Sequence, residues 1–530
     1  MRKIIGLVLV ISMTGSLFAQ GISQEQQRKL NSALNIITHM YVDSIKDKKI
    51  VESTLESILK ELDPHSSYIP AEESKRVREQ LEGSFEGVGI QFKIYEDTLL
   101  VVQTISGTPA AKVGIQAGDR ILSINNENIA GIKIQNSGVF KRLRGPKGTE
   151  VTVTIKRGGI TEILEFKIIR DKIPIYSVDA TYMIGKEIGY IKINQFGSTT
   201  VQEFKKSLAS LQKKGMKHLI LSLKGNGGGY LNAATQLADE FLSENKLEVF
   251  TKGLNQPKNE TLSTKEGGFE KGKLIVLVDE YSASASEIVS GAIQDWDRGI
   301  IVGRRTFGKG LVQSEIPFYD GSYMRLTVAR YYTPTGRCIQ KSYKEGTEKY
   351  HNDLINRYKK GEFVNADSIH LVDTLKYHTL TLNRTVYGGG GIMPDVFVPF
   401  DTTRMTPYYI NMVGRGVVNK VVMQYIDKNR TELKTKYSSF EKFKTEYQIE
   451  DAMMDAFVVA GNKEKVKFDT TQYELAKPLI KLQLKALIAR DLWEMNEYNQ
   501  IMDADNETLQ KAIEILQTAG AYEGILKSNH

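Results

Sequence analysis

The sequence is poor in the residues that build disulfides and metal centres. Its 530 residues contain one cysteine, Cys338, so no internal disulfide can form and packing must hold the core. Cys338 has no histidine or acid close in sequence, which favours a packed side chain over a nucleophile. The seven histidines are scattered, without an HExxH motif or paired spacing, so we expect no metal site.

An excess of one charge is also missing. Lysine and arginine number 71 and aspartate and glutamate 63, and the two signs are interspersed. A net charge of +8 distributed in this way is not a nucleic-acid footprint, so we expect no nucleic-acid partner. The hydrophobic content of 41% is ordinary for a globular protein, and this length predicts about two to four domains.

Long apolar runs are absent after the N-terminus. Arg2 and Lys3 precede an apolar run over 4–18 and a small-residue cleavage site near Ala19. This run is short for a membrane anchor and contains Ser, Thr and Gly, which favours a cleaved signal peptide over residues 1–19. We therefore expect export to the bacterial periplasm or cell envelope.

The pattern of apolar residues and turns changes along the chain, which predicts a multidomain α/β protein. Apolar residues recur at helical spacing near both ends, short alternating strands with glycine turns follow the first helices, and strands alternate with helices in the middle. The expected regions are a signal peptide (1–19), an N-terminal helical domain (24–82), a β-rich module (84–171), an α/β core (172–400, with a polar insert at 341–386) and a C-terminal helical domain (401–530).

The segment VDEYSASASEIVSGAIQDW (278–296) places three serines between a predicted strand and a predicted helix. Ser284 and Glu287 fit a capping box, S-x-x-E, so one interpretation is that Ser284 only caps the helix. The same turn also suits a nucleophile. The amide of Ala285 and the helix dipole would favour a developing oxyanion, and the flanking alanines leave room for a substrate carbonyl.

A hydroxyl nucleophile needs a base, and no Ser-His-Asp arrangement is evident. TFGKGLVQ (306–313) places Lys309 between two glycines, which allow close backbone approach and a buried turn. To act as a base, Lys309 must be neutral, which requires its pKa to fall by roughly three units, on the order of 4 kcal/mol. Burial and a helix N-terminus lower such a pKa, and Gln313 could orient the amine without adding charge.

A third motif, LKGNGGGYL (223–231), is a strand that ends in three glycines. Its backbone amides could bind an anion or form half of an oxyanion hole. A phosphate loop is the competing interpretation, but no GxxxxGK[ST] pattern is present.

Together, SASASEI, TFGKGLVQ and KGNGGG resemble the carboxy-terminal processing, or tail-specific, protease family. LDPHSSY, FEGVG, TPAAKVGIQAGDRILSIN, RYYTPTGRCIQ and GGGIMPDVFVP are also similar to family segments, so the resemblance covers roughly residues 30–400. It implies a serine endopeptidase with a Ser-Lys dyad, a PDZ domain and a protease core of crotonase/Clp-protease-like type. No cofactor or metal is implied.

The resemblance also implies roles for single residues. Ser284 is the implied nucleophile, Lys309 the implied general base, and Gln313 the implied residue that positions this base. The amides of Gly229 and Ala285 are the implied oxyanion hole, with Gly228 as the fallback for Gly229. Ser282 and Ser286 would then be structural hydroxyls.

The module at 84–171 resembles a PDZ domain, in which the loop Gly87-Val88-Gly89-Ile90 would present amides to a C-terminal carboxylate. The peptide would then add as a strand to a sheet edge. The expected partners are therefore unstructured C-terminal tails of protein substrates. An adaptor protein and a homo-oligomer stay open.

Two departures from the family pattern stand near the site. Ser222-Leu223-Lys224 replaces Asp-Leu-Arg before the glycine-rich loop, which would change how that loop is braced. Arg304-Arg305 replaces an acidic residue before TFGKG, and these charges would favour a neutral Lys309 if they lie close to it.

Two other functions remain as alternatives. One is a catalytically latent PDZ scaffold that binds protein C-termini. The other is a crotonase-type acyl-CoA enzyme, against which the signal peptide, the PDZ-like module and the Ser-Lys pair argue. Hydrolysis of an unstructured protein rather than an acyl thioester would separate the protease from the second alternative.

Overall fold

The computed structural model describes residues 22–265, 267–370 and 373–528, and the predicted signal peptide lies outside them. The chain divides into two units, 1–61 and 62–530. The first contains α1 (Gln24–Met40) and α2 (Asp47–Leu62), and the Ser23 hydroxyl caps α1 by accepting from Gln26 N. Within the described ranges, no helix is long and apolar enough to cross a membrane.

The second unit begins with the β-rich module. Its hairpin turn at Glu96 and Asp97 has φ values of 48° and 52°, the left-handed backbone of a tight two-residue turn. The sheet order is β3-β4-β5-β7-β8. The strands are β2 (Ser84–Gly87), β3 (Ile90–Tyr95), β4 (Thr98–Thr104), β5 (Arg120–Ile124), β6 (Glu127–Asn128), β7 (Glu150–Lys156), β8 (Ile163–Ile169) and β9 (Asp171–Pro174), with helices α4 (Pro109–Lys112) and α5 (Asn136–Leu143). Antiparallel hairpins join β3 to β4 across 96–97 and β7 to β8 across 158–159, as expected for short alternating strands with turns between them.

The α/β core is built on a six-stranded sheet of order β10-β11-β12-β15-β16-β21. All pairs from β11 to β21 are parallel. Such strands are covered on both faces, which explains why β15 reads LIVLV and is buried throughout. The strands are β10 (Val178–Ile184), β11 (Ile188–Ile193), β12 (His218–Ser222), β15 (Leu274–Val278), β16 (Ile300–Gly303) and β21 (Val396–Phe397).

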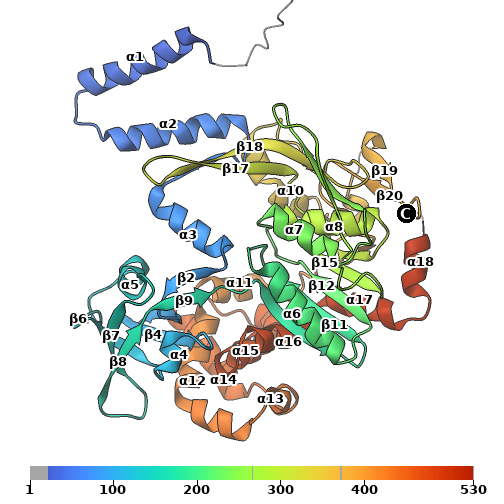
Figure 1. The fold of residues 1–530 in the computed structure, drawn as a ribbon. Helices are drawn as coiled ribbons and strands as arrows, with labels where there is room; N and C mark the ends of the chain where they lie inside the picture. The colour runs from blue at the N-terminus through green and yellow to red at the C-terminus, as the bar shows by residue number, and fades with distance from the viewer. Residues whose placement is uncertain (1–21, 266, 371–372, 529–530) are drawn as a thin grey trace, which may run out of the picture. The chain divides into compact units, whose positions relative to one another are not determined.

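Helices cover both faces of this sheet (Figure 1). Alternate residues of the strands join α6 (Thr200–Lys213), α7 (Leu231–Asp239) and α8 (Ala285–Asp295) in one core cluster. The other residues join α17 (Glu507–Gln517) and α18 (Ala521–Lys527), drawn in red. We expected one C-terminal helical domain, but these last two helices complete the α/β core. Their apolar stripes did not reveal which surface they cover.

The chain also forms a second sheet. Its strand order is β1-β18-β13-β14, and β17 pairs with β18. Its strands are β1 (Ser67–Ile69), β13 (Leu247–Lys252), β14 (Asn259–Leu262), β17 (Leu311–Pro317) and β18 (Tyr323–Tyr332). The pairing of β1 with β18 is long-range, so the segment after α2 belongs to this sheet rather than to a continuous helical block over 24–82.

The remaining elements are mostly short helices. They are α3 (Ala71–Leu81), α9 (Thr347–His351), α10 (Asp353–Lys359), β19 (Lys376–His378), β20 (Thr385–Tyr387), α11 (Pro407–Gly414), α12 (Val417–Lys436), α13 (Phe440–Glu446), α14 (Asp451–Lys463), α15 (Thr470–Leu492) and α16 (Met495–Met502). The predicted multidomain α/β class, with helical, β-rich, α/β and helical regions in that order, is confirmed.

Candidate active site

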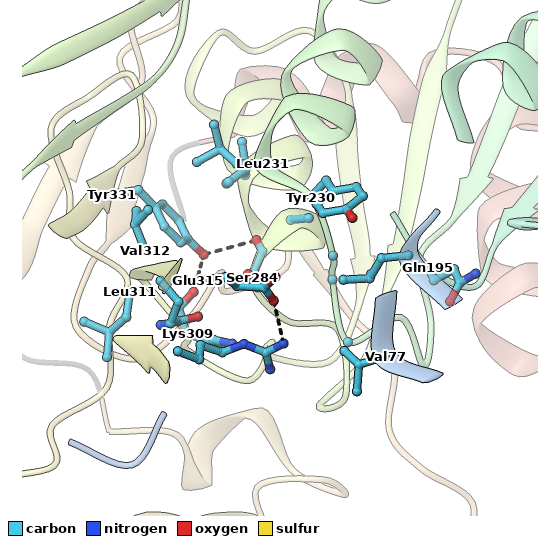
Figure 2. Close-up of a pocket in the computed structure, with 18 of the residues that line it drawn as sticks. Val77, Gln195, Tyr230, Leu231, Ser284, Lys309, Leu311, Val312, Glu315 and Tyr331 are labelled. Atoms are coloured by element: carbon cyan, nitrogen blue, oxygen red, sulfur yellow. Dashed lines mark hydrogen bonds and ion pairs between the residues drawn. The ribbon is translucent and has the colours of Figure 1, made fainter. Parts of the chain in front are cut away.

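One cavity of about 520 Å³ brings together all six residues for which the sequence predicted catalytic roles. It is lined by Ser284, Lys309, Gln313, Gly228, Gly229 and Ala285. Apolar side chains of Val77, Leu231, Leu311 and Val312 form part of its wall, as Figure 2 shows. The arrangement is suited to binding an apolar peptide side chain beside a hydroxyl and an amine.

Ser284 stands at the turn from β15 into α8, where it is the N-cap residue. Its backbone has φ 56° and ψ −112°, a conformation that non-glycine residues rarely adopt. Such strain persists only where surrounding contacts hold it, and it is common at functional sites.

Glu287 supplies much of that restraint. Its carboxylate accepts from the N–H groups of Ser284 at 2.8 Å, Gly308 at 2.8 Å and Lys309 at 2.9 Å. The Thr306 hydroxyl also donates to it, at 2.5 Å. Glu287 is fully buried, and burial raises its pKa to about 7 while these donors oppose the rise. The capping box therefore does more than begin a helix, because the same carboxylate holds the serine turn and the lysine loop together.

Tyr331 makes a second connection between the two loops. Its buried hydroxyl is hydrogen-bonded to the backbone carbonyls of Ser284 and Lys309, as the dashed lines in Figure 2 show. Glu287 therefore holds the backbone N–H groups of Ser284 and Lys309, and Tyr331 holds their backbone carbonyls.

The other two serines of the segment serve the glycine-rich loop. The Ser282 hydroxyl donates to Leu223 O at 2.8 Å, and the Ser286 hydroxyl donates to Asn226 O at 2.8 Å. Both side chains are fully buried. Ser282 and Ser286 thus join the serine turn to the loop that follows β12, and Ser284 is the one of the three that lines the cavity.

The amides of the glycine-rich loop are not equivalent. Gly228 N–H donates to the Asn226 side chain at 2.9 Å, so this donor is already used. In the described part of the chain, the N–H groups of Gly229 and Ala285 have no acceptor, and both residues line the cavity. Gly229 has φ 148°, and a Cβ at this position would lie 2.1 Å from Phe196 O, so only glycine fits. Gly229 and Ala285 are therefore better placed than Gly228 to receive an anion.

The Lys309 amine lies in surroundings that disfavour its charge. Burial, followed by the positive charge of Arg325, lowers the pKa of Lys309, while Glu287 and Asp63 oppose the shift. Arg304 and Arg305 do not supply this effect. They are engaged with carboxylates of their own, Glu280 at 2.7 Å and Glu362 at 2.5 Å. The arginine that acts on Lys309 comes from β18, which the local sequence could not indicate.

The contacts of Gln313 differ from the expectation. Its side-chain amide donates to the Thr327 hydroxyl at 3.5 Å, and Thr327 is its partner in the β17–β18 register. Among the described residues, no hydrogen bond joins Gln313 to the Lys309 amine, or that amine to the Ser284 hydroxyl. Catalytic hydrogen bonds are often long in the absence of substrate and tighten in the complex.

Lys224, at the first departure from the family pattern, braces the loop from the far side of the sheet. Its amine donates to the Asn506 side chain at 2.9 Å and to the Thr508 hydroxyl at 3.1 Å. Asp279 accepts from Gly225 N at 2.9 Å and so provides a carboxylate for the loop from the next strand.

A second cavity, of about 670 Å³, lies between β3 and α5 of the β-rich module on one side and residues 176–179 and 494–496 on the other. Of the loop Gly87 to Ile90, Ile90 lines this cavity, whereas Val88 is buried in the core of the module. Phe85, Phe92 and Phe140 give the cavity an apolar wall.

Several residues of the site escaped the sequence analysis. Asn226, Tyr331 and Thr327 act on the site through hydrogen bonds. Asn226 and Tyr331 stand inside motifs that had drawn attention, KGNGGG and RYYTPTGRCIQ, whereas Thr327 does not. Among the described residues, no group of three or more His, Cys, Asp or Glu side chains is arranged to hold a metal ion.

Comparison with known families agrees with this geometry. Residues 187–349 match Peptidase family S41, residues 100–157 match the PDZ domain, and residues 408–494 match a family of unknown function, DUF8443.

Characterised relatives extend the similarity. The carboxy-terminal-processing protease of Bartonella bacilliformis is 36% identical over 353 residues, 64% of this chain and 80% of the relative. The carboxy-terminal processing protease CtpB of Bacillus subtilis is 34% identical over 323 residues, 60% of this chain and 66% of the relative. A solved photosystem II D1 C-terminal processing protease is 26% identical, with a TM-score of 0.32 over 60% of this chain and 90% of that one. The sequence relationships suffice to conclude that the chain belongs to the carboxy-terminal processing proteases of peptidase family S41 and carries a PDZ domain.

Proposed function

We propose that the protein is an exported serine endopeptidase with a Ser284–Lys309 dyad that cleaves proteins at or from unstructured C-terminal tails. The observation that carries this proposal is the shared cavity. Ser284 and a partly buried Lys309 both line it, and Glu287 holds their backbones together. The lowered pKa of Lys309 increases the fraction of neutral amine that can accept a proton near neutral pH.

The reaction follows from these positions. Ser284 Oγ attacks the scissile carbonyl carbon while Lys309 Nζ takes the hydroxyl proton, and the carbonyl oxygen becomes an oxyanion. When the C–N bond breaks, Lys309 returns the proton to the leaving amine and an acyl-enzyme remains. Water then attacks the ester, with Lys309 again the base, and the Ser284 hydroxyl is restored.

The oxyanion would lie between the N–H groups of Gly229 and Ala285. Both residues line the cavity, and neither amide has an acceptor in the described part of the chain. Donors that are fixed before the reaction stabilise the developing charge without reorganisation, and one such donor contributes about 3 kcal/mol. Gln313 would help to position Lys309 from four residues along the chain, with its own side-chain amide held by the Thr327 hydroxyl.

The PDZ domain would capture the tail. Its apolar cavity beside β3 offers a sheet edge to which a peptide adds as a strand, with main-chain hydrogen bonds supplying affinity. Export to the periplasm or cell envelope is proposed from the basic residues and apolar run that precede Ala19. N-terminal sequencing of the protein from cell fractions would test it, and an uncleaved cytoplasmic product would contradict it.

The proposal is tested by incubating the protein with a disordered, apolar-tailed substrate at neutral pH. We expect Ser284→Ala and Lys309→Ala each to lower kcat/KM by roughly a thousandfold or more. Ser290→Ala is a matched control, because this buried hydroxyl of α8 donates to Ser286 O. Lys344→Ala, in the polar insert, is the corresponding lysine control.

A substrate whose terminal carboxylate is masked should be cleaved slowly if the tail is read. Tail binding without cleavage by the parent protein would favour the latent scaffold. Cleavage that survives Ser284→Ala would eliminate the dyad, and equal cleavage of masked and free tails would eliminate tail capture while leaving the dyad intact.

A further inference from the structure

The segment Asp63 to Ser66, from the LDPHSSY motif, forms a buried turn around a carboxylate. Asp63 Oδ1 accepts from the N–H groups of His65 at 2.8 Å and Ser66 at 2.9 Å, and the Ser66 hydroxyl donates to Oδ2 at 2.6 Å. Asp63 and Ser66 are each 7% exposed. These bonds alone would make Asp63 a turn residue, but the carboxylate also makes a contact outside the turn.

That contact leads to β18 and from there to β17. The Thr327 hydroxyl donates to Asp63 Oδ1 at 3.1 Å, and Thr327 N donates to the Ser66 hydroxyl at 3.1 Å. Thr327 is also the residue that receives the Gln313 amide. A continuous path therefore runs from Asp63 through Thr327 to Gln313, four residues after Lys309.

A second route connects the same turn to the residue after Lys309. His65 Nε2 is hydrogen-bonded to the Tyr350 hydroxyl at 2.7 Å, and the Gln340 side chain donates to that hydroxyl at 3.4 Å. Gln340 in turn accepts from Gly310 N at 2.8 Å, directly beside Lys309. One short segment is thus connected to the chain at two positions that follow Lys309, Gly310 and Gln313.

Several charged or titratable groups surround the Lys309 amine. They are Arg325 and Tyr331 of β18, Glu315 of β17, Glu287 of α8, and Asp63 and His65 of the turn.

Their electrostatic effects on Lys309 oppose one another. Burial and Arg325 lower the pKa of Lys309, and Glu287 and Asp63 raise it. Burial, and next the charge of Lys309, lowers the pKa of His65 to about 4, so this imidazole is neutral near neutral pH.

We propose that Asp63 is a positioning residue for Lys309. It holds Thr327 and Gln313 in place on β18 and β17, and its negative charge opposes the effect of Arg325 on the amine. This inference rests on the proposed role of Lys309 as the base. It assigns a part in catalysis to a motif that precedes the PDZ domain in the chain.

The pH dependence of kcat/KM tests the inference. Activity rises with pH as Lys309 loses its proton, so the acidic limb follows the pKa of this amine in the free enzyme. Asp63→Asn keeps the acceptor oxygen for Thr327 but removes the negative charge, so the limb should shift to lower pH. Arg325→Gln removes the opposing positive charge, so the limb should shift to higher pH.

Asp320→Asn is the matched control. Asp320 closes a similar turn by accepting from Ser322 N and its hydroxyl, and it lies outside the cavity lining. We expect its acidic limb to match that of the parent. A uniform loss of activity in Asp63→Asn, with an unmoved limb, would show a purely structural role and overturn the inference. Shifts in the same direction for Asp63→Asn and Arg325→Gln would also overturn it.

A second readout does not depend on turnover. In the Ser284→Ala background, the rate at which an amine-reactive ester acylates Lys309 can be followed against pH by mass spectrometry of the Lys309 peptide. Asp63→Asn should move this profile to lower pH and Arg325→Gln to higher pH. If Asp63→Asn does not fold, Thr327→Val and Arg325→Gln carry the test, and an unchanged profile in both overturns the inference. Shifted profiles in an inactive enzyme would refute the dyad but keep the electrostatic pairing.

Discussion

At the scale of single residues, Glu287 connects the serine turn to the lysine loop. Three backbone N–H groups and one hydroxyl donate to a carboxylate that solvent does not reach. A buried charge is costly unless donors surround it, and here the donors belong to the two segments that the proposed reaction must hold in register. Because Glu287 is buried in this arrangement, the pKa of its carboxyl group is raised to about 7.

This shift predicts a dependence of stability on pH. Because the pKa of Glu287 is higher in the folded than in the unfolded chain, its contribution to stability is fully present below about pH 4.5 and is lost as pH rises through 7. Glu287→Gln removes the titration and leaves an amide donor facing N–H donors, which should cost about 2 kcal/mol. Urea unfolding at pH 5 and pH 8 should show a smaller difference between the two pH values in Glu287→Gln than in the parent.

The surface substitution Glu345→Gln is the control for loss of one carboxylate. Its unfolding free energy should track that of the parent at both pH values. An equal pH effect in the parent and Glu287→Gln would mean that Glu287 does not titrate in this range.

At the scale of elements, the glycine-rich loop is held by the start of α17. Asn506 caps this helix by accepting from Leu509 N. The same side chain accepts a hydrogen bond from the amine of Lys224, a residue that follows β12. Thr508 receives the same amine. Burial lowers the pKa of Lys224 to about 8. The amine keeps N–H donors whether it is charged or neutral, so both hydrogen bonds can persist. A helix more than 270 residues downstream therefore supports the loop that would bind the oxyanion.

Lys224→Met should lower kcat by about three- to tenfold with little change in KM. The lost hydrogen bonds are each of order 1 kcal/mol, and a looser oxyanion loop affects the transition state more than substrate binding. Steady-state kinetics on the disordered substrate would measure the effect.

Lys224→Arg is the matched variant, because it keeps the donors that reach Asn506 and Thr508. We expect it to retain most of the parent kcat. If Lys224→Met has the parent kcat, or if both variants lose activity equally, the brace does not act on the loop.

At the scale of the molecule, two terminal regions differ in what they contribute. The helices α17 and α18 cover the second face of the central sheet, where Leu509, Ile515, Leu516 and Tyr522 are buried. Residues 1–61 form a unit with its own contacts, separate from residues 62–530.

Deletion of residues 507–530 should therefore unfold the core. Four large apolar side chains at about 2 kcal/mol each amount to roughly 8 kcal/mol, comparable to the whole stability of a typical domain. Deletion of residues 20–58 should leave the core folded and able to cleave its substrate. Thermal denaturation and gel filtration of both truncations would test this contrast, and a folded 1–506 fragment would contradict the assigned role of α17.

Much of the local structure followed from the sequence. The alternating strands of the β-rich module, and the strand and helix on either side of the serine segment, were predicted because alternation and capping residues act over a few neighbours. Ser284, Lys309 and Gly229 stand in glycine- and alanine-rich turns after strands, and the resemblance to the protease family selected them among their neighbours. Parallel strands bring such turns to one edge, and one cavity does contain all three.

What only the tertiary structure decided is how distant segments meet. Asp63 contacts Thr327 across 264 positions of sequence, Lys224 contacts Thr508 across 284, and Tyr331 joins the backbones of two separate loops. Each of these side chains is unremarkable in its local pattern, since an apolar stripe or a lone polar residue does not specify its partner. The sequence by itself determined the local elements and the chemical groups. The fold determined their surroundings, because burial and hydrogen bonding depend on neighbours in space.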